Sequence, residues 1–90
     1  MKIEFDRAKR EATLTHRGLD MARADEVFAG NTITVEDDRM EYGEKRFITV
    51  GLLEERMIVL VWTPRGEARR IISMRKANAR EQKIYQGRLV

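Results

Sequence analysis

The sequence of 90 residues predicts an α+β fold: two N-terminal helices, then a four-stranded, mainly antiparallel sheet and a C-terminal helix. Two observations lead to this prediction. Apolar residues recur at helical spacing over residues 1–30 and afterwards alternate or run together as they do in strands. The connections between the expected strands are short, which favours antiparallel neighbours. Because this length supports a single core, we expect residues 1–90 to form one domain.

The first expected helix begins after Asp6, whose side chain can accept a hydrogen bond from a backbone N–H of the first turn. Ala8, Ala12 and Leu14 follow at helical spacing. Gly18 can adopt the left-handed conformation that ends a helix, so we expect the helix to stop after about Arg17. Asp20 repeats the capping signal, and the second helix carries an apolar stripe of Met21, Ala24, Val27 and Phe28 that ends at Gly30.

Ile3 and Phe5 alternate as in a short strand, but the main sheet is expected later in the chain. Its four strands are predicted at residues 32–35, 47–50, 57–63 and 70–74. Residues 57–63 are nearly all apolar, which is typical of a central strand covered on both faces. Residues 36–44 are expected to form an acidic loop, residues 51–56 a reversal of chain direction and residues 64–67 a turn. A last helix is expected from Ala77 to Tyr85, with Ala77, Ile84 and Tyr85 facing inward.

Composition excludes several classes of protein. Without cysteine there can be no disulfide, no thiolate chemistry and no cysteine-ligated zinc. The charged start is unlike a secretory signal, and the apolar run at residues 57–62 is too short to span a membrane. We therefore expect a soluble, cytoplasmic protein without a membrane partner.

The charge of the chain is unevenly distributed. Residues 64–90 hold eight Lys and Arg against two Glu, a net charge of +6, whereas residues 1–63 hold ten basic against thirteen acidic residues, a net charge of −3. Such asymmetry predicts one basic face, which is the usual electrostatic footprint for nucleic acid. The alternative is a solvated, arginine-rich surface.

Two features are interpreted as structural. His16 is the only histidine, so it cannot form a usual zinc site, and we favour a surface residue at a helix C-terminus over an acid or base. The acidic residues 36–38 lack the pattern of a calcium loop. Arg39, Lys45 and Arg46 are close enough to neutralise them, so we expect a salt-bridged loop in which Asp37 or Asp38 binds backbone amides.

Arginines at the ends of the predicted strands are the strongest chemical signal. In adjacent antiparallel strands these side chains can converge over one face; they are Arg46, Arg65, Arg69, Arg70 and Arg75. Several guanidinium groups would bind a phosphate and stabilise the more highly charged species formed when it is attacked. RNA supplies its own nucleophile, the 2′-hydroxyl, so no side-chain nucleophile is needed, and we expect no cofactor. Glu44 could accept the proton, and Tyr85 or an arginine could assist the departing oxygen. Trp62 or Tyr42 could stack on a base, although we favour core packing for Trp62.

Three groups of residues, spread along the chain, together form a recognisable sequence pattern. The first is Phe5-Asp6-x-x-Lys9 with Gly18, Ala24, Val27 and Phe28. The second is Glu36-Asp37-Asp38-Arg39-x-x-Tyr42-Gly43-Glu44-x-Arg46-Phe47. The third is Trp62-Thr63-x-Arg65-Gly66, Arg70-Ile71-Ile72-Ser73-x-Arg75-Lys76-Ala77 and Glu81 with Tyr85. Over almost the whole chain this order resembles the BrnT toxins, and the block at residues 70–77 is the most specific part.

The resemblance implies a RelE-like fold and a metal-independent ribonuclease toxin that stops translation. It also implies a BrnA-like antitoxin with a ribbon-helix-helix DNA-binding part, and a complex that binds operator DNA. Carried over by position, the implied catalytic residues are Arg46, Arg65, Arg70, Arg75 and Glu44. The implied RNA-binding residues are Arg80 and Tyr85, to which we add Lys45 and Lys76 as further RNA-binding candidates. A non-catalytic nucleic-acid-binding module and an antitoxin-docking module are the alternatives.

The chain departs from the family pattern at the end of the first helix. The family usually has Asn and then Lys-His-Gly there, whereas this chain places Arg17 at the histidine position and His16 one residue earlier. On a helix, one residue corresponds to a rotation of about 100°. The side chain at residue 16 therefore points in a different direction from the family's histidine.

Overall fold

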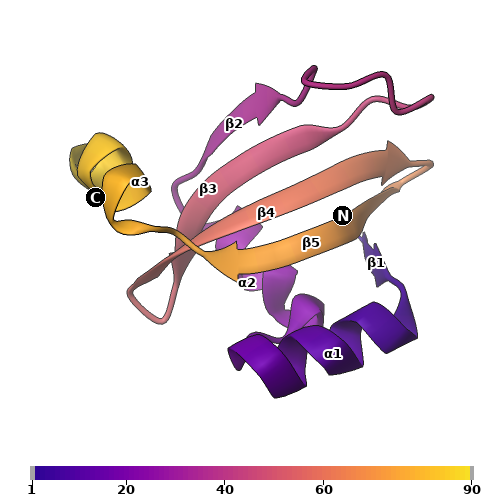
Figure 1. Ribbon diagram of the computed structural model, residues 1–90, viewed down its shortest axis with the longest axis horizontal. Helices are drawn as coiled ribbons and strands as arrows, with labels where there is room; N and C mark the ends of the chain where they lie inside the picture. Colours follow the sequence, from indigo (N-terminus) through magenta and orange to yellow (C-terminus); the bar gives the residue numbers. More distant parts are fainter. Residues whose placement is uncertain (1, 90) are drawn as a thin grey trace.

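The computed structural model describes residues 2–89, which form a five-stranded mixed sheet with helices around it (Figure 1). The strands are β1 (Lys2–Phe5), β2 (Ile33–Glu36), β3 (Phe47–Leu53), β4 (Arg56–Arg65) and β5 (Ala68–Lys76). The helices are α1 (Arg7–Arg17), α2 (Ala24–Ala29) and α3 (Ala79–Tyr85), with 3-10 turns η1 (Met21–Arg23) and η2 (Gln86–Arg88). The strand order is β1-β5-β4-β3-β2.

The α+β class is confirmed, but the prediction of a four-stranded sheet is wrong. The short segment around Ile3 and Phe5 joins the sheet as β1, parallel to β5, with Lys2 opposite Ala68 and Phe5 opposite Ile71. The other three pairings are antiparallel, as expected. Parallel pairing joins segments that are distant in sequence, so no local turn in the sequence predicts it.

The apolar segment at residues 57–63 forms the middle strand of the sheet, as predicted. Ile58 and Leu60 are completely buried on one face of β4, and Val59 is 2% exposed on the other. Burying an aliphatic side chain of this size contributes about 1.5–3 kcal/mol. Strand β4 therefore has fully buried aliphatic residues on both of its faces.

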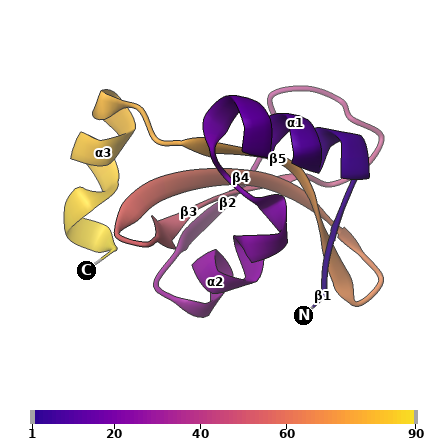
Figure 2. The ribbon, with the colours of Figure 1, turned by 90° about the horizontal axis from the view of Figure 1, so that it is seen from below.

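The two faces of the sheet are covered differently (Figure 2). Helix α2 and turn η1 pack on one face, here called the helix face. Its core residues are Leu19, Met21, Ala24, Val27, Leu53, Ile58, Leu60, Trp62, Ile71 and Met74. Only one end of the other face is covered, by α3 and η2; it is here called the open face, and its buried residues are Val50, Val59, Ala77 and Leu89. Most of the open face is therefore left for contacts with other molecules.

Helix α1 begins and ends as predicted, but its apolar residues are not buried. The Asp6 side chain accepts hydrogen bonds from two backbone amides of the first turn, and Gly18 has a φ of +69°. Ala8 and Ala12 are exposed, and Leu14 is 45% exposed, so the expected apolar stripe is wrong. Polar contacts attach the helix instead.

These polar contacts come from two arginines of α1. Arg10 donates two hydrogen bonds to the Asp20 carboxylate, at 2.7 and 3.0 Å. Arg17 donates one to the backbone oxygen of Met74, at 2.9 Å. This oxygen lies on β5 beyond Ile71, where the pairing with β1 ends. Arg17, at the position of the family's histidine, thus joins α1 to the edge of the sheet.

The second predicted helix consists of η1 followed by α2. The Asp20 side chain accepts a hydrogen bond from the Ala22 amide, as the capping signal predicts. Met21, Ala24 and Val27 are all buried, so the predicted apolar stripe is confirmed. These side chains form most of the cover of the helix face.

Gly51 lies within β3, and the reversal predicted at residues 51–56 is correspondingly shorter. The turn is made by Glu54 and Glu55, with φ of 50° and 67°. A Cβ atom at Gly51 would lie 2.6 Å from Cγ1 of Val27 and 3.0 Å from Cγ2 of Thr32. The glycine therefore allows α2 to approach the sheet, a tertiary reason that a local pattern does not reveal.

The C-terminal elements differ from prediction in detail. Strand β4 continues through Pro64 to Arg65, so the turn at residues 64–67 is confined to its last two residues. Helix α3 begins at a capping box between Asn78 and Glu81. Ala77 is buried and Tyr85 half-buried, as predicted, but Ile84 is 54% exposed and does not face inward. Within residues 2–89, no helix is long and apolar enough to cross a membrane.

Candidate functional site

A bulge in β5 places two of the predicted arginines on the same face. Residues five positions apart in a regular strand point to opposite faces. However, Val61 pairs with Ser73 and Trp62 with Ile71, which leaves Ile72 as an extra residue. Arg70 and Arg75 therefore both lie on the open face.

Three arginines come together at one end of this face, here called the arginine end and defined by Arg46, Arg65 and Arg70. Arg70 pairs directly with Thr63 of β4, and Arg65 lies two residues beyond Thr63 on the same face. Arg46 immediately precedes Phe47, the partner of Trp62, so strand alternation puts it on the open face as well. Adjacent strands are about 4.8 Å apart, so the Arg46 and Arg70 backbones are separated by about 10 Å. Guanidinium groups can reach across that distance to a single anion.

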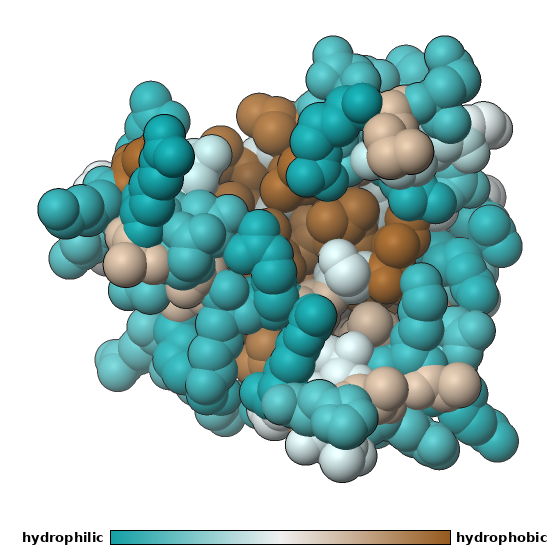
Figure 3. All heavy atoms as spheres, viewed as in Figure 1, coloured by the Kyte–Doolittle hydropathy of each residue, from teal (hydrophilic) through white to brown (hydrophobic). Residues whose placement is uncertain are grey.

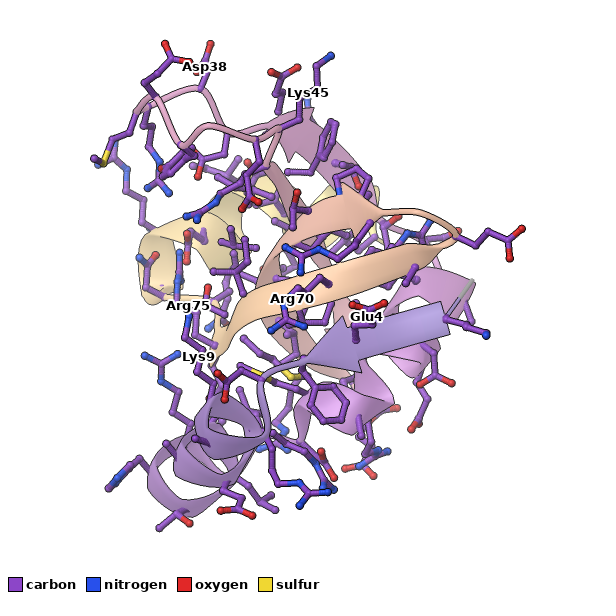
Figure 4. The ribbon with its side chains drawn as sticks, turned by 90° about the vertical axis from the view of Figure 1, so that its right-hand side faces the viewer. Glu4, Lys9, Asp38, Lys45, Arg70 and Arg75 are labelled. Atoms are coloured by element: carbon purple, nitrogen blue, oxygen red, sulfur yellow. The ribbon has the colours of Figure 1, made fainter. Side chains whose placement is uncertain are left out.

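Two carboxylates hold these arginines. Glu44 lies 3.1 Å from Nε of Arg46 and 4.0 Å from a terminal nitrogen of Arg65. Glu4 of β1 lies 3.6 Å from Arg70, and Figure 4 shows the two side by side. The sequence did not indicate Glu4, because its position depends on the parallel pairing of β1 with β5.

The loop that carries Glu44 and Arg46 is fixed by a buried aspartate. The Arg46 guanidinium lies over the Tyr42 ring, 4.1 Å from its centroid. The Tyr42 hydroxyl donates a hydrogen bond to Asp37 at 3.2 Å, and Arg39 donates two more at 2.7 and 2.8 Å. The bonds from Arg39, more than that from Tyr42, lower the pKa of Asp37 to about 2. Asp37 also accepts a hydrogen bond from the backbone N–H of Arg39 at 3.3 Å, so the expected anchoring of the loop by Asp37 is confirmed. Arg46, however, pairs with Glu44 and not with residues 36–38.

Arg75 lies at the other end of the open face. Four strand positions separate its partner Val59 from Thr63, the partner of Arg70, which corresponds to about 13 Å. Arg75 donates two hydrogen bonds to the Glu81 carboxylate, at 2.8 and 2.9 Å. These bonds raise the pKa of Arg75 and lower that of Glu81 to about 2. The pair joins β5 to α3, so Arg75 also has a structural role.

The predicted RNA-binding residues are divided between surfaces. Arg80 and Tyr85 line a groove on the open face together with Arg75. Lys76 pairs with Ile58 and therefore lies on the side of the helix face, in a hollow with Glu55 and Arg56. Lys45 lies in the loop shortly before β3, and Figure 4 shows its side chain on the side of Asp38, away from Arg70 and Arg75. Only Arg80 and Tyr85 thus share a surface with the predicted catalytic arginines.

Trp62 packs in the core, as favoured from the sequence. It is 9% exposed, stacks on Phe47 with ring centroids 5.0 Å apart, and donates a hydrogen bond to Oγ1 of Thr49 at 2.8 Å. Arg69 lies on the same helix face, 4.0 Å from the centroid of the Phe28 ring. Neither Trp62 nor Arg69 contributes to the open face.

His16 lies exposed in the last turn of α1, the surface position that we favoured. It lines a hollow between α1 and β5 with Lys9 and Ser73. No group of three His, Asp or Glu side chains in residues 2–89 is close enough to hold a metal ion.

The arginine end can bind a phosphate group and respond to an increase in its negative charge. Each guanidinium presents several N–H donors in a plane that matches two phosphate oxygens. Glu44 lies among these donors and could accept a proton from a group bound there. This chemistry fits attack on a phosphodiester by a neighbouring hydroxyl group.

Comparison with known families identifies a relationship over most of the chain. The family model described as "Ribonuclease toxin, BrnT, of type II toxin-antitoxin system" matches residues 5–81. A search of curated proteins found no match. The matched range begins at the last residue of β1, includes strands β2 to β5, the arginine end and Arg75, and ends within α3.

Proposed function

The chain belongs to the BrnT family of ribonuclease toxins of type II toxin–antitoxin systems, and we propose that it cleaves RNA through the 2′-hydroxyl of its substrate. The observation that carries the proposal is the arginine end, where three arginines from different segments lie on one face of the sheet and two of them, Arg46 and Arg65, flank the Glu44 carboxylate. We also propose that residues 1–90 act as one RelE-like ribonuclease domain in the cytoplasm.

The proposed reaction needs no nucleophile from the protein. The 2′-hydroxyl oxygen forms a bond to the adjacent phosphorus, and its proton passes to the Glu44 carboxylate. The bond from phosphorus to the 5′-oxygen then breaks while a guanidinium N–H donates a hydrogen bond to this oxygen. The 5′-oxygen takes a proton from a water molecule, which in turn receives the proton held by Glu44. The products are a 2′,3′-cyclic phosphate and a 5′-hydroxyl. Arg46, Arg65 and Arg70 stabilise the pentavalent species between these steps.

Arg75, Arg80 and Tyr85 are proposed to bind a different part of the RNA strand. A site about 13 Å along the sheet from Arg70 is too distant to share one phosphate with the arginine end. Arginines can bind a further phosphate there, and the Tyr85 ring offers a surface on which a base can stack. We assign Lys45 and Lys76 only a long-range attraction for RNA, since they lie away from this face.

The biological role follows from the family. We propose that RNA cleavage by this protein stops translation and that a BrnA-like antitoxin neutralises it. A ribbon-helix-helix part of the antitoxin would bind operator DNA as part of the complex.

The test is to incubate the purified, partner-free protein with a defined RNA in excess EDTA and to map the new ends. A ribosome-containing translation reaction is run in parallel. We expect cyclic or 3′-phosphate ends, and at least a hundredfold slower cleavage in Arg70→Lys and Arg46→Lys, in line with the loss of one oriented donor (about 10²–10³). These variants retain the charge but lose the planar guanidinium.

Arg88→Lys is the matched control, because Arg88 is exposed in η2 at the end of the chain. Intact RNA in both assays, together with binding that weakens steeply with salt, would support a non-catalytic nucleic-acid-binding module instead. That module is the second candidate function. It is favoured because every arginine of the arginine end already forms an ion pair with a carboxylate of the protein.

A further inference from the structure

The open face carries a groove of about 520 Å³ between α3, the loop before β3 and the sheet. Five aliphatic residues form its floor: Val35, Ile48, Val50, Val59 and Val61. Figure 3 shows apolar side chains gathered in the middle of this face and surrounded by hydrophilic ones. The groove is therefore apolar inside and polar at its margin.

Aliphatic side chains on both sides of the groove are exposed to solvent. Val35 of β2 is 52% exposed and Ile84 of α3 is 54% exposed. They are two of the four large hydrophobic residues exposed within residues 2–89; the others are Leu14 and Met40. Apolar groups gathered around one concave surface, with a polar rim, mark a site of interaction with another molecule.

The rim is positively charged. Arg39, Arg75 and Arg80 line it from the loop, from β5 and from α3, against one carboxylate, that of Glu81. The charge of Arg39 is close enough to oppose the rise in the pKa of Arg75 that Glu81 causes. A guanidinium carries five N–H donors, more than one carboxylate accepts, so these arginines can bind further carboxylates at the rim.

The aliphatic floor does not suit RNA. RNA is recognised by hydrogen bonds and by stacking on aromatic rings or guanidinium planes, and valine and isoleucine side chains offer neither. An aliphatic floor with a cationic rim instead complements a protein segment that has aliphatic side chains on one side and Asp or Glu beside them.

We propose that the groove is the docking site of the antitoxin, which inserts a segment of aliphatic residues flanked by carboxylates. The proposal rests on the proposed function, because it assigns the partner of the same toxin. A segment seated in the groove would cover Arg75, Arg80 and Tyr85. Inhibition would then result from blocking the path of the RNA along the open face, with the fold of the toxin unchanged.

The test is calorimetric titration of the toxin with the purified protein encoded by the gene next to its own. Val35→Ser and Ile84→Ser each remove exposed apolar surface without adding charge, and we expect each to weaken binding about tenfold, the effect of a moderate interface residue. Leu14→Ser is the matched control, because Leu14 is 45% exposed on α1, away from the groove. Arg80→Ala should weaken binding and make it less dependent on salt.

Two outcomes of the affinity measurements would overturn the proposal. One is unchanged affinity in the double variant Val35→Ser/Ile84→Ser, and the other is weaker binding in Leu14→Ser alone. Circular dichroism of each variant establishes that it is folded. If sedimentation shows that the toxin alone is a dimer that the double variant abolishes, the occupant is a second copy and the proposal is wrong.

RNA cleavage by the same variants separates this proposal from the proposed function. The serine variants should cut RNA at the rate of the parent protein but resist inhibition by the neighbour-encoded protein. If neither the parent protein nor any variant cuts RNA, the proposed function is wrong. The affinity measurements then still test whether the groove is the docking site. If RNA is cut and all variants are inhibited equally, only the docking proposal fails.

Discussion

The arginines of the open face are oriented by carboxylates. Glu44 holds Arg46 and Arg65, and Glu4 holds Arg70. These arginine side chains remain 27–54% exposed, and ion pairs in such positions contribute about 0–1 kcal/mol. Phosphate likewise makes charge-assisted, often bidentate hydrogen bonds with guanidinium groups. A phosphate can therefore share these guanidinium groups with the carboxylates at small cost and find the arginines already oriented.

Glu81→Gln should reduce the sensitivity of the protein to acid. The pKa of Glu81 is lowered from 4.5 to about 2, chiefly by the hydrogen bonds from Arg75. A carboxylate with a lowered pKa stabilises the folded state fully above its unfolded pKa and loses that contribution as pH falls, here between about pH 5 and pH 2. The variant should be less stable than the parent at neutral pH, and its Tm should change less across that window.

Thermal unfolding at intervals from pH 6 to pH 2 measures this effect. Asp20 and Asp37, whose pKa values are also about 2, keep part of the acid dependence in the variant. Glu67→Gln, an exposed change in the β4–β5 turn, is the control. Parallel Tm curves for the parent and Glu81→Gln would show that the pair with Arg75 does not stabilise the fold.

At the scale of single residues, the sequence predicted which residue types form the site better than it predicted where they lie. Arg46, Arg65 and Arg70 were chosen because arginines at strand ends suit a phosphate, and they do share a face. That Arg75 joins them on this face depends on the extra residue in β5, which alternation alone does not predict. Glu4 was missed because its neighbour Arg70 is 66 positions away and adjacent only through the β1–β5 pairing.

At the scale of elements, the packing of α2 on the sheet depends on Gly51. Gly51→Ala should destabilise the protein by about 1–3 kcal/mol, the usual cost of adding a methyl group to a filled core. The reason is that the new Cβ would lie 2.6 Å from Cγ1 of Val27, a distance that forces α2 away from β3. Urea unfolding of both proteins measures the difference in free energy of unfolding.

Gly87→Ala is the control for this experiment, since a Cβ there would have no atom within 4 Å. Its stability should stay within about 0.5 kcal/mol of the parent, as for most surface changes. A Gly51→Ala protein as stable as the parent would mean that Val27 and Thr32 move aside without loss, and that the glycine is not needed for packing.

Helix ends were predicted well because they are fixed by neighbouring residues. Asp6 and Gly18 bound α1 through bonds within one turn, so the signal is local. Burial is a tertiary property and was predicted less well. Helix α1 is attached by Arg10 and Arg17 and leaves Leu14 exposed, a mode of attachment that apolar spacing does not reveal.

For the molecule as a whole, the open face combines two kinds of surface. The arginine end is cationic and polar, whereas the groove next to it has an aliphatic floor and a cationic rim. The proposed substrate and the proposed antitoxin would both use Arg75 and Arg80. Competition between them for one face would make inhibition a direct consequence of binding.

The salt dependence of RNA binding tests how the charge of the whole molecule is used. Residues 64–90 carry a net charge of +6, but the fold places Lys76 and Arg69 on the helix face. The proposed contacts therefore come from five arginines: Arg46, Arg65, Arg70, Arg75 and Arg80. For a single strand, log Kobs falls with log salt with a slope of about −0.7 per phosphate contact, so we expect a slope of about −3.5.

Single substitutions separate contact from long-range attraction. Arg65→Ala should make the slope less steep by about 0.7, whereas Lys45→Ala and Lys76→Ala should leave it unchanged because those side chains lie on other surfaces. Fluorescence anisotropy with a 2′-O-methyl RNA measures binding without cleavage, since the proposed nucleophile is blocked. An equal decrease in slope for all three variants would mean that the protein holds RNA by its overall charge, with no preference for the open face, and the arginine end would lose its proposed role in binding.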